Sequence, residues 1–460
     1  MTTPAYSARM QWPPTGAAAP DPLAGWPHQI PAEVAQTLAD MRFVHALEQG
    51  PAAQWRRWQA QRLGALVSWL RQSPVWRDWL APLPAGPAAL PDHMHALPVM
   101  RRTDYRRFIE SAPVRVPPAF GAIGHKETSG STGQPVRFAY TALARRMNFG
   151  IYHADHERQG RDLREDTLVL TGHDRPVDGG QHVTAGDPWL HPGRQIFRHS
   201  YAHGVDEHAR WLCAQRAAHL VTYPALLSGI LSSIERQGLQ PPQLRQVITF
   251  AETADAVLRE RVRRLLGARV VDRYSCEELG PIAFQCPVSD DHQHVAVCNV
   301  IAEVVDADGR PLPHGQQGSV LVTGLHQWAS PALRYELGDV ATLLAHCPAC
   351  GAQVPTFTRL LGRRRVLVER ASGELMYVRI LAGDWLQAAP VLREWRVAQT
   401  ARFAFDVELA ASRALHAHEQ AALQALLAER IGPEFTFALR EVAQVNWPPG
   451  RKKQEIVTLG

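Results

Sequence analysis

The sequence is poor in cysteine and has no long apolar run. Six cysteines in 460 residues are too few for a disulfide scaffold, and we expect them to be reduced. No uninterrupted apolar stretch reaches the roughly 20 residues that a membrane-spanning helix requires. The N-terminus has no basic segment followed by an apolar core, so we expect no secretory signal. Together these absences predict a cytoplasmic protein that has no membrane partner.

Charge of either sign is also moderate. Charged residues make up 20% of the chain, and the formal net charge is +5. The arginines are scattered over expected helix faces, as in the segments RRW, RRTDYRR and RERVRR. We interpret them as solvated surface and expect no nucleic-acid partner. An anionic substrate in a basic cleft stays compatible with this composition.

The residues that are present predict a large α/β protein. Residues 1–30 are rich in proline and alanine and predict an irregular arm, packed on the body through Trp12 and Trp26. Past Pro31 helical periodicity continues for about eighty residues. Beyond this region, short β-branched runs alternate with helical segments, which is typical of a largely parallel sheet covered by helices. The runs are 167–172, 219–224, 246–252 and 268–275, and the intervening helices include 225–238 and 255–267.

The later part of the chain has a different pattern. Residues 299–325 predict two strands around an Asp-Ala-Asp-Gly turn. A smaller α+β segment follows, and we predict a large domain over 31–361 and a small mobile lid domain over 362–460. The elements expected in the lid are a strand at 402–410, a helix at 417–432, a strand at 434–442 and a basic tail.

The stretch KETSGSTGQPVRF, residues 126–138, is rich in serine, threonine and glycine. It lacks the Gly-Lys-Ser/Thr ending of the common phosphate-binding loop, and it is not a dinucleotide Gly-x-Gly-x-x-Gly. Its composition alone favours an idle surface loop over a loop that holds an anion. The other motifs in the chain change this interpretation.

The segment TSGSTGQP resembles the phosphate loop of the adenylate-forming ligase superfamily. Further segments resemble that superfamily's motifs in the expected order, and within it YSCEELGPIAFQCP is most similar to the phenylacetate–CoA ligase-like branch. The segments are FAETA (250–254), DRYSCEELG (272–280), RYELGD (334–339), LGR (361–363) and PPGRKKQEIV (448–457).

The resemblance implies an ATP-dependent reaction. A carboxylic acid would be activated to an acyl-adenylate with release of pyrophosphate, and the acyl group would pass to a thiol, first of all that of CoA. ATP, Mg²⁺ and CoA are the implied cofactors and co-substrate. Two alternatives stay open: an amide-forming synthetase that uses an amine, and a catalytically idle scaffold.

The resemblance also assigns roles to single residues. Tyr274 would stack on adenine, Asp339 would accept from the ribose hydroxyls, and Glu278 would bind Mg²⁺. Lys452, or its neighbour Lys453, would neutralise the developing charge during adenylation, and we take Lys452, Glu278 and Thr132 as the catalytic group. The full nucleotide-binding set is Thr128, Ser129, Gly130, Ser131, Thr132, Gly133, Ala251, Glu252, Asp272, Tyr274, Ser275, Glu278, Asp339, Arg363 and Lys452.

Three positions depart from the family pattern. Gln134 stands where the family more often has lysine, which predicts a looser hold on pyrophosphate. Glu277 replaces the usual threonine, and its carboxylate would repel phosphate unless it pairs with Mg²⁺ or an arginine. Arg365 stands near the hinge, where many relatives carry Asp or Lys. Gln134 and Glu277 are the features that favour the scaffold alternative.

The cysteines form a second constellation. Cys347 and Cys350 have the Cys-x-x-Cys spacing that suits tetrahedral Zn²⁺, although a redox pair has the same spacing. Some members of the branch carry a structural zinc, and the resemblance adds Cys286 and His294 as the other ligands. His292 and His346 are alternative fourth ligands, and an empty cluster of reduced thiols is the alternative to a metal site.

The resemblance also predicts where the acid substrate would bind. The resemblance places its pocket around residues 136–150, 171–175 and Tyr223. Aromatic and apolar side chains in the first range are compatible with an aromatic acid, or with ordinary core packing; they are Phe138, Tyr140, Met147 and Phe149. The sequence is compatible with a monomer or with a homodimer.

Overall fold

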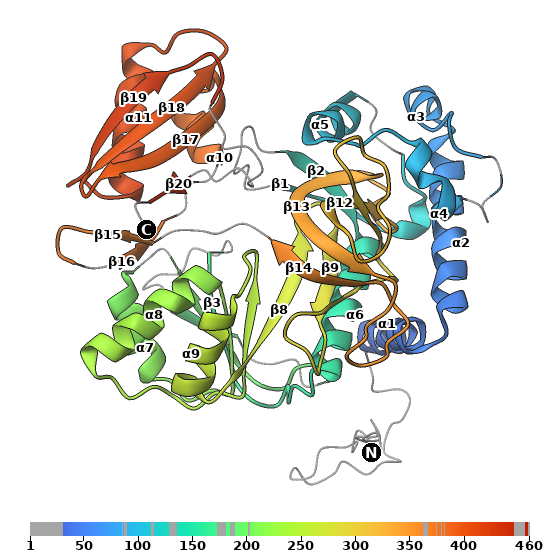
Figure 1. Ribbon diagram of the computed structural model, residues 1–460, viewed down its shortest axis with the longest axis horizontal. Helices are drawn as coiled ribbons and strands as arrows, with labels where there is room; N and C mark the ends of the chain where they lie inside the picture. Colours follow the sequence, from blue (N-terminus) through green and yellow to red (C-terminus); the bar gives the residue numbers. More distant parts are fainter. Residues whose placement is uncertain are drawn as a thin grey trace.

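The computed structural model describes most of the chain between residues 31 and 458 (Figure 1). Several predicted features lie outside the described residues: the arm 1–30, the loop 128–135 with Gln134, the hinge residues Arg363 and Arg365, and the tail residues Lys452 and Lys453. The described ranges are 31–84, 86, 90–111, 115–127, 136–172, 181–184, 189–200, 203–361, 367–373, 375–378, 380, 382–445 and 456–458.

The N-terminal part is helical, as predicted. α1 (Ala32–Gln49) and α2 (Ala52–Leu70) each follow a proline, which fixes φ at a helix start, and α1 stops at Gly50. Their apolar faces share one core with the antiparallel half of the large sheet. The shorter elements of this part are α3 (Pro74–Trp79), α4 (Leu90–His93), η2 (Met94–Ala96), α5 (Arg102–Ser111) and η3 (Pro118–Phe120).

The centre of the molecule is a twelve-stranded sheet in the order β11-β12-β13-β14-β10-β9-β8-β7-β6-β3-β5-β4. One half is parallel, because β5, β3, β6, β7 and β8 all run in the same direction. Its strands are β3 (Thr167–Thr171), β5 (Gln195–His199), β6 (His219–Thr222), β7 (Gln246–Phe250) and β8 (Arg269–Cys276), with β4 (Gln181–Thr184) antiparallel at the edge.

The helices of this half confirm the predicted alternation. α8 and α9 end at Gly238 and Gly267, whose left-handed φ of +61° and +63° suits a helix C-terminus. Asp255 is the N-cap of α9, and its carboxylate accepts from the Leu258 backbone N–H at 2.9 Å. The helices are α7 (Val205–Cys213), α8 (Pro224–Gln237) and α9 (Ala256–Leu266), while the preceding α6 (Ala142–Arg158) packs against α1 and β9.

The other half of the sheet is antiparallel. The predicted pair of strands at 299–325 is confirmed as β11 and β12, which turn at Gly309 with φ +79°. The strands are β9 (Gly280–Gln285), β10 (Gln293–Val295), β11 (Val300–Val305), β12 (Gln317–Gly324), β13 (Tyr335–Leu344) and β14 (Thr356–Leu361). A separate hairpin, β1 (Ile123–Glu127) with β2 (Arg137–Thr141), carries the segment 128–136 between its strands.

The C-terminal part has a core of its own, in which Trp385 and Trp395 stack with ring centroids 5.3 Å apart. In Figure 1 its four-stranded sheet lies apart from the large one, while the β15–β16 hairpin lies beside α7 and α8. The elements are β15 (Leu367–Glu369), β16 (Leu375–Tyr377), α10 (Ala382–Ala388), β17 (Leu392–Ala401), β18 (Ala404–Ala411), α11 (Ala417–Arg430), β19 (Thr436–Glu441) and β20 (Ile456–Val457).

The architecture confirms the predicted α/β class, with a large mixed sheet and a smaller C-terminal α/β unit. None of the described helices has both the length and the apolar character that a bilayer crossing requires. The interpretation of the arginines as solvated surface is wrong in part. Arg259 is buried, and its guanidinium donates to the Val270 carbonyl at 3.1 Å and to Gln285 Oε1 at 2.9 Å.

Candidate active site

Two of the predicted nucleotide-binding residues meet across the sheet. The Tyr274 hydroxyl donates to Asp339 Oδ2 at 2.9 Å, and Phe357 packs edge-on to the Tyr274 ring at 5.9 Å. Tyr274 lies on β8 and Asp339 on β13, and three strands separate them in the sheet order. The antiparallel half must therefore curl back over the end of β8, which brings two motifs that are distant in the sequence to one place.

Glu278, the predicted Mg²⁺ ligand, is buried in the turn after β8. The Tyr335 hydroxyl donates to its Oε1 at 2.9 Å, and Arg102 Nη1 lies 3.5 Å from the same oxygen. These contacts fix the carboxylate and partly balance its charge. A carboxylate oxygen held in this way can serve a hard cation, which prefers oxygen ligands.

Glu277 has a cationic partner from another element. Its Oε2 lies 3.6 Å from Nζ of Lys126, at the end of β1. The sequence left Mg²⁺ or an arginine open as the group that would balance Glu277, and the structure adds a lysine. Lys126 lies 151 positions earlier in the chain, beyond the reach of any local pattern.

The segment after β7 is held in an unusual conformation. Ala251 has φ +66°, a region that residues with a Cβ adopt rarely and at a cost in free energy. The next residue, Glu252, is buried, and its Oε2 accepts from the Ala225 backbone N–H at 2.9 Å, in the first turn of α8. A carboxylate at a helix N-terminus is favoured by the helix dipole. Glu252 therefore fixes this segment at the carboxyl end of the sheet, where open α/β sheets bind ligands.

Asp272 and Ser275 also take part in internal contacts. Asp272 is buried and accepts from the Thr249 hydroxyl at 2.8 Å. Burial raises the pKa of Asp272 to about 6, although the Thr249 hydrogen bond acts in the opposite direction. Ser275 hydrogen-bonds the side chain of Tyr152. Both residues therefore have partners inside the protein, on the same strand as Tyr274.

Three residues of this region were missed as site residues by sequence reasoning: Arg102, Lys126 and Tyr335. Tyr335 was inside the quoted motif RYELGD, so its position was available as a signal. Arg102 was inside the segment RRTDYRR, which we had interpreted as solvated surface, and its side chain is only 29% exposed. The motif's own Arg334 is structural, because its guanidinium pairs with Glu303 at 3.1 Å inside the fold.

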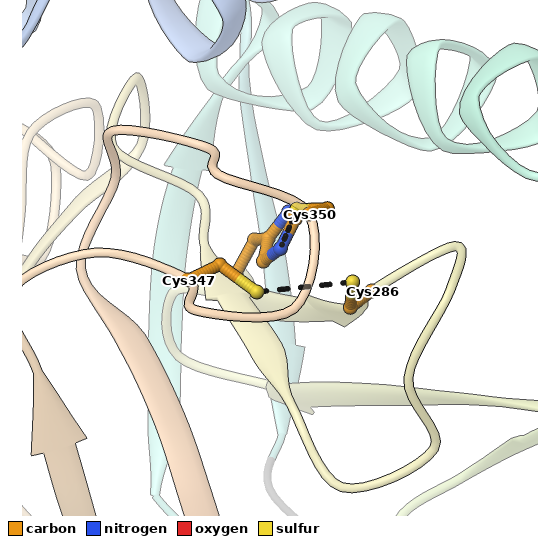
Figure 2. Close-up of side chains that lie close together, drawn as sticks. Cys286, Cys347 and Cys350 are labelled. Atoms are coloured by element: carbon orange, nitrogen blue, oxygen red, sulfur yellow. Dashed lines mark hydrogen bonds between the residues drawn. The ribbon is translucent and has the colours of Figure 1, made fainter. Parts of the chain in front are cut away.

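The four predicted zinc ligands come together, and Figure 2 shows the three cysteines of this group. Cys286 directly follows β9, His294 lies on β10, and Cys347 and Cys350 lie in the loop after β13. The ligand atoms of these four residues all lie within 4.8 Å of one another. The Sγ atoms of Cys347 and Cys286 are 3.8 Å apart, and Cys350 Sγ is 3.3 Å from His294 Nε2. Bonds of about 2.3 Å to sulfur and 2.0 Å to nitrogen give tetrahedral edges of about 3.8 and 3.5 Å, so the set fits Zn²⁺.

The alternative ligand His292 is also near the cluster. Its Nδ1 lies 3.5 Å from Cys347 Sγ, while its backbone carbonyl accepts from the Cys286 N–H at 2.8 Å. Burial lowers the pKa of His294 to about 4, so this imidazole is neutral at pH 7, the form that binds metals. Burial raises the pKa of Cys286 to about 12, so the thiol holds its proton unless a cation takes its place.

The predicted acid pocket is described only in part, because residues 173–175 lie outside the described ranges. Phe138 and Met147 are buried in the protein core, which supports core packing for these two. Phe149 is 48% exposed and lies edge-on to His153. Tyr223 is buried, and its hydroxyl accepts from the Gly172 backbone N–H at 3.1 Å.

Comparison with known proteins finds similarity to one enzyme family over part of the chain. Residues 128–328 match the AMP-binding enzyme family. This match supports the predicted resemblance to the adenylate-forming ligase superfamily. It is 32% identical over 130 residues to phenylacetate–coenzyme A ligase of Pseudomonas putida, which is 27% of this chain and 30% of that protein. The name of this relative supports the predicted resemblance to the phenylacetate–CoA ligase-like branch.

A second relative, phenylacetate–coenzyme A ligase of Escherichia coli K12, is 28% identical over 150 residues, or 31% of this chain and 34% of that protein. The matched stretch thus spans about a third of each relative's length. The similarity in fold covers more of the chain than the similarity in sequence. A crystal structure of 2-hydroxyisobutyryl-CoA ligase with 2-HIB-AMP and CoA covers 90% of this chain and 91% of its own, with a TM-score of 0.61 and 18% identity.

Proposed function

We propose that the protein is an AMP-forming carboxylate–CoA ligase. The observation that carries this proposal is the meeting of Tyr274, Glu278 and Asp339 at the carboxyl end of β8, inside a chain whose residues 128–328 match the AMP-binding family. The names of the curated relatives, both phenylacetate–CoA ligases, support CoA as the acceptor.

Each described residue has a role that suits its surroundings. Asp339, steadied by the Tyr274 hydroxyl, accepts from the ribose hydroxyls, and the Tyr274 ring provides a face for adenine. Glu278 would hold Mg²⁺, which supplies positive charge beside the phosphates when bound. Glu252 keeps the segment after β7 in its strained conformation at the edge of the nucleotide.

The remaining parts of the proposal fall on residues outside the described ranges. Thr128 to Gly133 would surround the phosphates with hydroxyls and backbone N–H groups, and Thr132 would take part in catalysis. Arg363 would contact the ribose, and Lys452 would serve adenylation from a lid formed by residues 362–460. Rotation of that lid would then admit the thiol.

We also propose a structural zinc at the Cys/His cluster. Its support is the chemistry of the donor set, three sulfurs and one imidazole nitrogen, and the distances between them. The metal would join the end of β9, β10 and the loop after β13, which are separate in the sequence. It lies in the body of the fold and would stabilise it, without a part in the reaction.

The decisive measurement is carboxylate-dependent ATP–pyrophosphate exchange over a library of acids. We expect exchange with at least one acid, and we expect CoA to raise net pyrophosphate release with that acid. If an amine raises net pyrophosphate release in this second assay and CoA does not, the protein is the amide-forming alternative. If the protein neither binds ATP nor supports exchange with any acid, the scaffold alternative holds and the proposal is wrong.

A further inference from the structure

Two acidic residues stand side by side where the resemblance places the nucleotide phosphates. Glu277 and Glu278 follow Cys276 in the turn between β8 and β9. Each carboxylate has a cationic partner from a different element: Arg102 of α5 lies 3.5 Å from Glu278, and Lys126 of β1 lies 3.6 Å from Glu277. The pairs differ in burial. The Glu278 side chain is 7% exposed, whereas those of Glu277 and Lys126 are 39% and 56% exposed.

Lys126 also stands at a place fixed by strand pairing. β1 and β2 are paired up to Glu127 and Arg137, and Lys126 is opposite Phe138, which is buried. The two paired strands therefore end together at this point. The ion pair of Lys126 with Glu277 joins this end of the β1–β2 hairpin to the turn that carries Glu278.

We propose that Lys126 is a positioning residue for Glu277: it holds this carboxylate in an ion pair and so keeps a second negative charge away from the phosphates of the bound nucleotide. The inference rests on the proposed function, because it requires phosphates near this turn. It explains how a glutamate can occupy a position where phosphate repulsion is expected. An exposed ion pair of this kind contributes little to folding stability. We therefore expect its effect on nucleotide binding, through the neutralised charge of Glu277, to be the one that matters.

The expected effects depend on phosphate charge. A released carboxylate within several ångströms of a triphosphate repels several negative charges at once, but it repels a single phosphate much less. Lys126→Ala should therefore weaken MgATP binding roughly tenfold and change AMP binding about twofold or less. Lys126→Arg should keep ATP binding near the wild-type value, because the positive charge is retained.

The test is a double-mutant cycle measured by isothermal titration calorimetry with MgATP and with AMP. In the Glu277→Thr background there is no carboxylate to release, so the further change Lys126→Ala should alter ATP binding about twofold or less. His125→Ala is the matched control, since His125 is the neighbouring exposed residue of β1 and its side chain points to the opposite side of the strand. Melting temperatures of all variants should stay close to that of the wild type.

Two results would overturn the inference while leaving the proposed function intact. An equal loss of ATP affinity from Lys126→Ala in both backgrounds would mean that Lys126 contacts the phosphates directly. No loss in either background would make the pair an ordinary surface contact. A wild-type protein that binds neither ATP nor AMP would overturn the proposed function, and this inference with it.

Discussion

Asp339→Ala should reduce adenylation by about two to four orders of magnitude. Asp339 is buried, and its Oδ2 accepts the Tyr274 hydroxyl at 2.9 Å. Two ribose hydroxyls that donate to this carboxylate would each contribute about 1.5–3 kcal/mol, because a hydrogen bond to a charged group is among the stronger ones. Their loss together corresponds to about 3–6 kcal/mol, and each 1.4 kcal/mol is a factor of about ten.

The measurements are ATP–pyrophosphate exchange and calorimetric binding of AMP, and both should fall. Binding of AMP separates a loss of nucleotide affinity from a loss of chemistry alone. Tyr274→Phe is the matched control, because it removes the hydroxyl that donates to Asp339 and keeps the ring for adenine. We expect it to cost about 1 kcal/mol, or less than tenfold. If Asp339→Ala leaves AMP binding unchanged while the protein stays folded, the assignment of the ribose site is wrong.

The sequence predicted the elements that depend on local patterns. α8 and α9 were predicted from apolar stripes and from the glycines after them, and both end at those glycines. The strands of the parallel half were predicted from short β-branched runs, and β7 is buried along most of its length, as such runs require. In each case the signal lies within a few residues of the feature that it predicts.

Contacts between distant elements could not be predicted from local sequence patterns in the same way. Nothing in the pattern indicated that β9 to β14 continue the parallel strands as one sheet, because strand order depends on long-range pairing. The ion pair of Arg102 with Glu278 joins residues 176 positions apart. The motifs could name Tyr274 and Asp339, but their hydrogen bond follows from the curl of the antiparallel half.

The Cys/His cluster shows the value of a resemblance beside local spacing. Spacing alone identified Cys347 and Cys350 and left a redox pair open. The resemblance added Cys286 and His294, and the fold brings these four groups together. The 3.8 Å separation of Cys286 and Cys347 places a third sulfur beside the pair, an arrangement that suits metal binding better than a two-cysteine redox site.

Loss of the proposed zinc should lower the stability of the large domain. We expect about one zinc per purified chain by elemental analysis, and none in Cys347→Ser. Apparent binding free energies of structural zinc are about 10–16 kcal/mol, so even partial loss should cost about 3 kcal/mol or more. In a domain of this size that corresponds to a decrease in melting temperature of roughly 4 °C or more, with adenylation affected only secondarily.

Three variants make this prediction specific. Cys213→Ser is the control, because Cys213 is a half-buried thiol at the end of α7, outside the cluster, and we expect it to keep both zinc and melting temperature. His294→Ala should lose the metal, whereas His292→Ala should retain it, since His294 completes the set of mutually close ligand atoms. The reverse outcome would make His292 the fourth ligand. A wild-type protein that contains no metal and melts at the same temperature as Cys347→Ser would show that the cluster is a group of reduced thiols, because the free energy of metal binding is then absent from the fold.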